Sequence, residues 1–374
     1  MTTKIFQGDR MKLRNLFFLC TYSLITTLNA ADIPITSLND SGEGTLRSAL
    51  EKQVSGDRLI FDSSLSGTLV LQSALPSING DIQIAGPSRG TISIDGDNAY
   101  SLLNILKGTV SIANLNFANG INGRLESAIY VNPNNTLILT NVHIKISTYA
   151  GGDYPIYVDT GGVLCTYGLS FDTDTIPHIN LNAGILEVCH STAGYSSFIV
   201  DGLGNIWVKN GEVVTLNTAT SSPVDISLIA DTGTAIFNGT STQPFIVDLD
   251  GGVLKGNYTC LYVASTGPLR PGTDSTFGVN TTTKDWSQTT DGILFIKINP
   301  EGNSDEIKVG GYANIAGTLT LVPANGTYIK GTKYTFLTAF SGFTTKTFDV
   351  VKSTDPSLNF TINYNANSIE IEIQ

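Results

Sequence analysis

Short β-rich runs recur along the chain at a spacing that restricts the folds it can adopt. Comparable runs begin at Gly108, Asn135, Gly162, Gly184 and Gly204, so successive starts are 27, 27, 22 and 20 residues apart. Repeats of this length are typical of solenoids, in which one coil cannot bury its own apolar side and must stack on the next. Stacked strands lie about 4.8 Å apart, and each pairs with its equivalent in the neighbouring coil. The spacing predicts an all-β, right-handed parallel β-helix, with a β-sandwich as the alternative.

The residue pattern inside the runs supports strands. Thr109-Val-Ser-Ile-Ala and Thr136-Leu-Ile-Leu-Thr alternate polar and apolar residues, and no long stretch past residue 55 keeps a helical period. The chain is 41% hydrophobic and only 14% charged. This composition can fill a core, so we expect a folded, turn-rich protein rather than a disordered one.

One early segment has the pattern of a helix. Gly44-Thr-Leu-Arg-Ser-Ala-Leu-Glu-Lys-Gln-Val places Leu46, Ala49, Leu50 and Val54 on a single helical face. The end of a solenoid must be protected from pairing edge to edge with other strands. We therefore predict that this short helix caps the first coil with its apolar side.

The N-terminal residues have the order of a secretory signal peptide. Lys12 and Arg14 precede an apolar run over residues 16–28, and small alanines follow. The run is shorter than the roughly 20 residues that a membrane span needs. We expect residues 1–31 to direct Sec-dependent export, with Met11 as an alternative start. The formal net charge is −11, and without Lys/Arg clusters we expect no nucleic-acid partner.

The cysteines do not suggest a disulfide framework. Cys20 would leave with the signal peptide, and Cys165, Cys189 and Cys260 then form an odd number. Aligning the coils stacks Cys165 on Glu187 and leaves its Cα about 8 Å from that of Cys189, whereas a disulfide needs less than about 7 Å. We expect buried thiols rather than a disulfide or a metal site.

Catalytic residues are not evident. A calcium-dependent polysaccharide lyase needs several carboxylates from neighbouring coils and a basic residue, and a glycoside hydrolase needs paired carboxylates. The acidic segment Asp95–Asn98 suits a tight turn between coils, and Ser41 suits a turn before the helix. Three histidines lack a context that marks them as a base: His143, His178 and His190. We expect no catalytic residue, no cofactor and no metal.

A few aromatic residues are candidates for ligand contact. Trp207, Tyr154, Tyr157 and Tyr195 would form a sugar-binding platform if their rings point outward. The alternative for each of them is packing in the core or in turns.

The N-terminal third resembles a known family. Asp40-Ser-Gly-Glu-Gly-Thr-Leu-Arg-Ser-Ala-Leu, Gly56-Asp-Arg-Leu-Ile-Phe, Ile84-Ala-Gly-Pro, Ile94-Asp-Gly and Ile112-Ala-Asn-Leu-Asn-Phe-Ala-Asn-Gly follow in order. This series resembles the start of pectin-lyase-like β-helix domains in bacterial adhesin-type surface proteins, including those similar to polymorphic outer-membrane proteins.

A second resemblance covers residues 251–374. Gly251-Gly-Val-Leu-Lys-Gly, Leu269-Arg-Pro-Gly, Ser304-Asp-Glu-Ile-Lys-Val-Gly-Gly, Gly317-Thr-Leu-Thr-Leu-Val-Pro and Tyr334-Thr-Phe-Leu-Thr-Ala-Phe-Ser-Gly follow in order. This part looks like the C-terminal part of autotransporter passenger domains. The resemblance implies export through the outer membrane by a fused barrel, surface display and a role in adhesion or virulence. The chain stops at residues 369–374, where that barrel would begin, so we expect the translocator to act in trans.

These observations predict three regions: a signal peptide over 1–31, a β-helix over 32–250, and a passenger-like region over 251–374 that continues the solenoid. We expect a secreted or cell-surface protein of a Gram-negative bacterium. Its expected role is structural or adhesive and non-enzymatic, with a host or cell-surface protein or glycan as ligand. The alternatives are a polysaccharide lyase or glycoside hydrolase on the same scaffold, and a non-functional remnant of a longer autotransporter.

Overall fold

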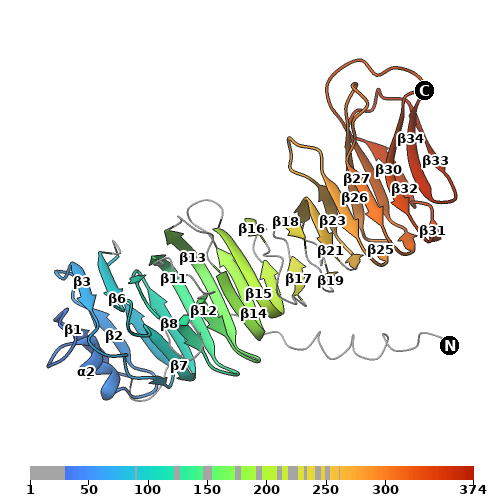
Figure 1. Ribbon diagram of the computed structural model, residues 1–374. Helices are drawn as coiled ribbons and strands as arrows, with labels where there is room; N and C mark the ends of the chain where they lie inside the picture. The colour runs from blue at the N-terminus through green and yellow to red at the C-terminus, as the bar shows by residue number, and fades with distance from the viewer. Residues whose placement is uncertain are drawn as a thin grey trace, which may run out of the picture.

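The computed structural model of the chain is a long stack of β-strand coils (Figure 1). It describes residues 30–88, 91–121, 127–145, 154–172, 178–190, 196–208, 213–217, 226–230, 234–240, 246–248, 253–260 and 262–374. The predicted signal peptide lies outside these residues, apart from its last two. Within the described ranges, no helix combines the length and apolar character needed to cross a membrane.

The elements follow one another along the stack. The first coils contain helix α2 (Leu46–Glu51) and the strands β1 (Asp32–Ile35), β2 (Arg58–Phe61), β3 (Gly67–Val70), β4 (Ile78–Asn79), β5 (Ile82–Ala85), β6 (Ile92–Asp95), β7 (Leu103–Lys107), β8 (Thr109–Ala113), β9 (Asn116–Ala118), β10 (Ser127–Val131) and β11 (Thr136–Lys145). The middle coils contain β12 (Tyr154–Val158), β13 (Val163–Asp172), β14 (His178–His190), β15 (Ser196–Val208), β16 (Val213–Asn217), β17 (Ile226–Ala230), β18 (Thr234–Thr240) and β19 (Ile246–Asp248). The C-terminal coils contain β20 (Val253–Gly256), β21 (Tyr258–Cys260), β22 (Val263–Ser265), β23 (Pro268–Pro271), β24 (Val279–Thr282), β25 (Trp286–Gln288), β26 (Ile293–Ile298), β27 (Glu306–Val309), β28 (Ala313–Ile315), β29 (Thr318–Pro323), β30 (Lys333–Ala339), β31 (Phe343–Lys346), β32 (Val350–Ser353), β33 (Phe360–Tyr364) and β34 (Ser368–Ile373).

The strand register matches the spacing of the repeats in the sequence. Parallel pairing joins, in successive coils, Thr109, Thr136, Val163, Ile185 and Asn205. Each of these residues directly follows one of the five predicted starts, so the spacing of 20 to 27 residues is the length of one coil. The stacked parallel strands confirm the predicted all-β parallel β-helix, and the β-sandwich alternative is wrong.

The core is a column of apolar side chains that runs through the coils. Val110, Leu137, Leu164 and Leu186 occupy equivalent positions and are fully buried. Ser111, the residue after Val110, is only partly buried because neighbouring residues of a strand point to opposite faces. Each buried leucine or valine contributes about 1.5–3 kcal/mol, so every coil is stabilised mainly by the coils above and below it.

Asparagines hold the turns at equivalent places in successive coils. Asn114 and Asn141 have φ angles of +56° and +50°, a left-handed region that asparagine tolerates better than most residues. The Nδ2 atom of Asn141 donates to Oδ1 of Asn114 at 3.3 Å, which ties one turn to the next. The backbone N–H of Gly108 donates to the buried Asn135 Oδ1 at 2.7 Å. The asparagines that bound the strand runs therefore connect the coils.

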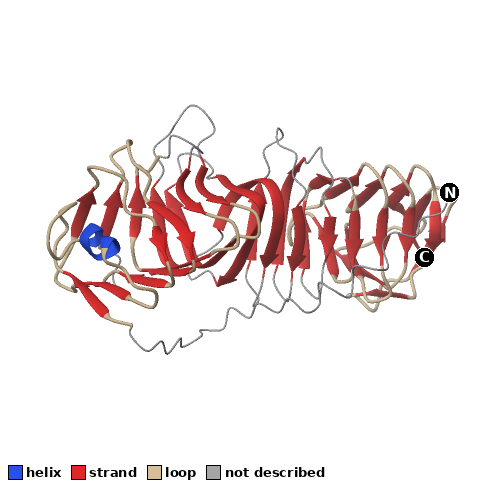
Figure 2. Cartoon of the chain, turned by 90° about the horizontal axis from the view of Figure 1, so that it is seen from below, coloured by secondary structure: helices blue, strands red, loops and turns tan. Residues whose placement is uncertain are grey.

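The predicted capping helix is present at the N-terminal end of the stack (Figure 2). Leu46, Ala49 and Leu50 of α2 are buried in the core, as predicted. The prediction that Val54 shares this face is wrong. The helix ends at Glu51, and Val54 lies beyond it with 57% of its side chain exposed.

The turn before α2 explains the motif that begins at Asp40. Arg47 Nη2 donates to Oδ1 of Asp40 at 2.6 Å and to the carbonyl oxygen of Ser73 at 2.7 Å. Gly44 has a φ of +73°, and a Cβ atom there would overlap Oγ1 of Thr36. The motif therefore joins the turn, the helix and the following coil, which is a structural role.

An antiparallel hairpin ends the stack. β34 pairs antiparallel with β30 and with β33, whereas the other named strand pairs are parallel. Leu358, Phe360, Ile362 and Tyr364 are partly buried against the core. The hairpin therefore covers apolar surface of the last coils, as α2 does at the other end.

Candidate functional site

The acidic segment Asp95–Asn98 is a turn between coils. The backbone N–H of Asp97 donates to Asp95 Oδ1 at 2.8 Å, and Asn119 Nδ2 lies 3.1 and 2.9 Å from Oδ1 and Oδ2 of Asp95. Asp97 and Asn98 adopt positive φ angles of 54° and 52°. The Asp95 carboxylate thus already accepts hydrogen bonds from its own turn and from the next coil.

The candidate nucleophile Ser41 and the one candidate base whose side chain is described, His143, lie on different coils. Ser41 is exposed in the turn before α2. His143 lies on β11, with its Nδ1 atom 3.0 Å from Oγ of Ser170. The side chains of His178 and His190 lie outside the described residues. Among the residues that are described, His, Cys, Asp and Glu side chains do not gather in groups of three or more.

Cys165 lies where the alignment of coils predicts. Cys165 pairs in register with Glu187, and both Cys165 and Cys260 are buried. Burial raises the pKa of the Cys260 thiol to about 12, although a backbone hydrogen bond with Tyr262 opposes this. The Cys260 thiol is therefore protonated and unreactive at neutral pH. The side chain of Cys189 lies outside the described residues.

One residue of the predicted aromatic platform can be placed. Tyr157 lies on β12 and stacks on Tyr130 of β10, with ring centroids 5.3 Å apart. The hydroxyl of Tyr130 donates to Oδ2 of Asp159 at 2.5 Å. Burial, reinforced by this hydrogen bond to Asp159, raises the pKa of Tyr130. One face of the Tyr157 ring therefore packs against the neighbouring coil, and this contact connects the two coils. Tyr195 and the side chains of Tyr154 and Trp207 lie outside the described residues.

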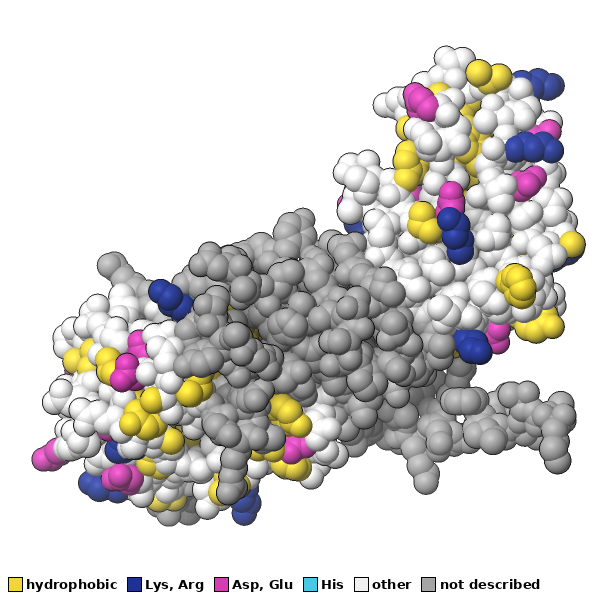
Figure 3. All heavy atoms as spheres, in the orientation of Figure 1, with side chains coloured by type: hydrophobic (Ala, Val, Ile, Leu, Met, Phe, Trp, Pro, Cys, Tyr) yellow, Lys and Arg dark blue, Asp and Glu magenta, His cyan; other side chains and the backbone are white. Residues whose placement is uncertain are grey.

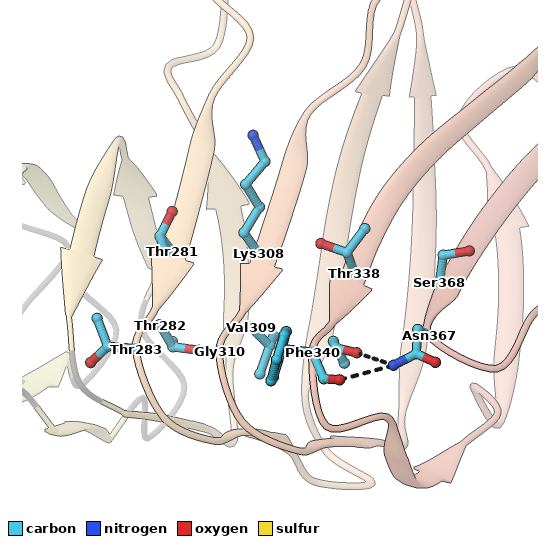
Figure 4. Close-up of a pocket in the computed structure, with 11 residues that line it drawn as sticks. Thr281, Thr282, Thr283, Lys308, Val309, Gly310, Thr338, Phe340, Asn367 and Ser368 are labelled. Atoms are coloured by element: carbon cyan, nitrogen blue, oxygen red, sulfur yellow. Dashed lines mark hydrogen bonds between the residues drawn. The ribbon is translucent and has the colours of Figure 1, made fainter.

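A different surface carries the groove that we take as the candidate site. An open groove of about 970 Å³ crosses β24, β27, β30 and the start of β34 (Figure 4). Its first row of side chains consists of Thr281, Lys308, Thr338 and Ser368, one from each strand. Strand pairing places them in register from one coil to the next. The row is thus a straight line of polar groups across the stack.

A second row lies on the turns that follow β24, β27 and β30 and on the turn that precedes the antiparallel β34. It consists of Thr283, Gly310, Phe340 and Asn367. Gly310 packs closely against the neighbouring coil, because a Cβ atom there would lie 2.6 Å from the carbonyl oxygen of Thr283. The Phe340 turn is held by Asn367, whose Nδ2 donates to the carbonyl oxygens of Ala339 at 2.9 Å and Phe340 at 3.0 Å. The groove therefore runs beside a firmly held phenylalanine.

The phenylalanine itself is unusually exposed for a large apolar side chain. Phe340 is 85% exposed, and Tyr312 in the neighbouring turn is 52% exposed. Backbone hydrogen bonds join the two turns, from Phe340 N–H to the Val309 carbonyl at 2.8 Å and from Ser341 N–H to the Gly311 carbonyl at 3.1 Å. Phe340 thus lines the groove, and a second exposed aromatic ring lies in the turn of the adjacent coil.

The groove carries little net charge. Nζ of Lys308 lies 2.7 Å from Oε2 of Glu306, so the one cation of the lining has an acidic partner. On the face of the molecule shown in Figure 3, charged side chains of the described residues are scattered among uncharged ones. Apolar contact and hydrogen bonds to hydroxyl and amide groups are the interactions that this lining can offer to a ligand.

Sequence reasoning missed the groove. Its residues form short runs that lie a coil length or more apart, and they contain neither a paired carboxylate nor a metal-binding spacing. One local signal is present: alternation past the buried Ala339 places Phe340 on the outside.

Comparison with protein-family models finds no match to this chain, and comparison with curated proteins finds none either. The solenoid is consistent with the fold of pectin-lyase-like β-helices.

Proposed function

We propose that this chain is an exported, non-enzymatic β-solenoid of the passenger type, secreted or displayed on the surface of a Gram-negative cell, that binds a protein partner along the groove at Phe340. The observation that carries this proposal is the exposed Phe340 ring that lines the groove. Exposed aromatic residues beside a groove are typical anchors of protein–protein contacts.

The solenoid supports this role by the way it displays the groove. Each strand contributes one residue to each row, at the fixed spacing of about 4.8 Å between paired strands. The rows are held by backbone pairing along their length, so binding would order little of the protein and lose little entropy. A rigid row of this kind suits an extended partner segment that crosses several coils.

The first test concerns where the mature protein resides. We expect intact cells treated with protease to lose the protein, while a periplasmic marker survives. Cell fractionation followed by immunoblotting checks this result. Recovery of the undigested chain only in the periplasm or cytosol would contradict surface display, and loss from the cells into the medium would indicate secretion.

Substitution of Phe340 by serine should weaken binding to a protein partner at least tenfold, because an aromatic anchor typically contributes about 2 kcal/mol or more. The measurement is binding of the labelled, purified protein to cultured animal cells. Prior protease treatment of those cells should abolish it. Ile329→Ser is the matched control, because Ile329 is 70% exposed but lies outside the groove. Equal binding by the two variants would refute the groove as the binding surface.

A further inference from the structure

A cluster of cations on another sheet of the C-terminal coils is not explained by the groove. Lys255 on β20 and Arg270 on β23 pair in register, and Lys297 lies on β26, the next strand of the same sheet (Figure 1). Nζ of Lys297 donates to the carbonyl oxygen of Pro271 at 2.6 Å, next to Arg270 in the chain. Three positive side chains therefore lie on adjacent strands, in a protein whose formal net charge is −11.

Two carboxylates lie among these cations, and each is bonded to a lysine. Asp274 binds Nζ of Lys255 through both oxygens at 2.8 Å. Asp305 pairs with Nζ of Lys297 at 3.0 Å and also accepts backbone N–H groups of Gly278 and Lys297. Asp305 is fully buried inside the cluster, and its carboxylate oxygens are already hydrogen-bonded. Asp274 is the carboxylate on the solvent side of the cluster.

Arg270 is left without an acidic partner among the described residues. Its guanidinium carbon lies 3.8 Å from the centre of the Phe295 ring. Its Nε atom is buried and has no hydrogen-bond acceptor. A guanidinium is always charged, and the Arg270 side chain is partly exposed, so this position favours an added oxyanion.

The surroundings of Asp274 show which charges an added oxyanion would encounter. The hydrogen bond from Lys255 lowers the pKa of the Asp274 carboxyl; burial opposes this, and the charges of Lys255, Arg270 and Lys297 add to the lowering. The side chain of Asp274 is nevertheless 74% exposed. One exposed carboxylate therefore lies in the field of three cations, and an anion from outside can share that field or take its place.

We infer that this cluster, centred on Arg270, binds a sulfate or carboxylate group of an acidic glycan. One arginine and two lysines, partly neutralised by two aspartates, suit a single oxyanion rather than the many phosphates of a nucleic acid. The choice of a glycan rests on the proposed surface location, because glycans present such groups there. The oxyanion site itself lies on a different sheet from the groove and does not depend on it.

The test is titration calorimetry of the purified protein at low salt with a heparin-derived tetrasaccharide, a hyaluronan tetrasaccharide and inorganic sulfate. We expect the wild type to bind the sulfated tetrasaccharide, and the affinity to fall steeply with added salt. Arg270→Gln should lower the affinity about tenfold or more, and Arg270→Lys should lower it less because it keeps the charge but not the planar fork. Asp274→Asn should raise the affinity severalfold, because it removes the competing carboxylate.

Lys333→Gln is the control, since it removes one positive charge from β30, outside the cluster. Its affinity should equal that of the wild type, and thermal unfolding of every variant checks that the fold is intact. Binding that is insensitive to Arg270→Gln, or that weakens in Asp274→Asn, would overturn the site. Binding of inorganic sulfate alone would overturn the glycan assignment, and preference for the hyaluronan fragment would identify the group as a carboxylate. Phe340→Ser should leave these affinities unchanged, so failure here is distinguishable from failure of the proposed protein contact.

Discussion

Replacing Asp305 by alanine is expected to lower the free energy of unfolding of the C-terminal coils by about 3 kcal/mol. Asp305 is fully buried, and its carboxylate accepts the backbone N–H groups of Gly278 at 2.9 Å and Lys297 at 2.7 Å. It also pairs with Nζ of Lys297, whose side chain is largely buried. Alanine removes these acceptors together and leaves two backbone donors and an ammonium without their partner, which typically costs several kcal/mol.

Urea denaturation followed by tryptophan fluorescence measures this effect. The matched control is Glu306→Ala, which removes the neighbouring carboxylate. Glu306 is exposed and pairs with an exposed Lys308, so its loss should change the free energy of unfolding by less than about 0.5 kcal/mol. Equal midpoints for the two variants would show that Asp305 does not hold this part of the stack.

The burial of Asp305 also makes the stability of the folded protein depend on pH. Burial raises the pKa of the Asp305 carboxyl above its ordinary value of 3.8, although the backbone N–H groups and Lys297 favour the charged form. The folded protein therefore holds this proton more tightly than the unfolded chain. The stabilisation that comes from this tighter proton binding is fully present below the ordinary pKa and is lost as the pH rises through the raised value. Relative to Asp305→Asn, the wild type should thus gain stability as the pH falls through that window.

The stacking of the coils could be predicted because its signals are local. Gly or Asn precedes each of the strand residues Thr109, Thr136, Val163, Ile185 and Asn205, and the apolar residues alternate after it. Parallel pairing then requires equivalent residues to stack, so a spacing read along the chain becomes a register in space. The same alignment predicted that Cys165 stacks on Glu187.

The candidate sites could not be predicted because they form across coils. Lys308 and Phe340 come from separate coils, and nothing in the local sequence relates them. Arg270 and Asp274 are close in the chain, but the cation cluster also needs Lys297, which strand pairing brings beside them. Residues 369–374 alternate like every other strand, so the pattern alone does not reveal the antiparallel pairing of the last hairpin.

Replacing Leu50 by aspartate should have the second large effect, at the opposite end of the stack. Leu50 lies in α2 and is 1% exposed, and Leu46 beside it is fully buried. A carboxylate at this position must either lose its hydration or leave the core, and we expect a local loss of about 4 kcal/mol. The cap would then detach and expose the edges of β1 and β2, which pair with each other in the first coils. Open strand edges recruit other strands, so the variant should associate as its concentration rises.

Val54→Asp separates the role of the cap from that of added charge. Val54 is four residues beyond Leu50 and would share its face if the helix continued, but it lies past the end of α2 and is exposed. The Val54 variant should remain monomeric by size-exclusion chromatography with light scattering, and its stability should change by less than about 0.5 kcal/mol. In the Leu50 variant, hydrogen exchange should accelerate at β1 and β2 and remain slow at β26 and β29, because each coil contacts only its neighbours. Uniformly faster exchange along the chain would instead show that the stack unfolds as one cooperative unit, and that the cap stabilises the distant groove as well as the first coil.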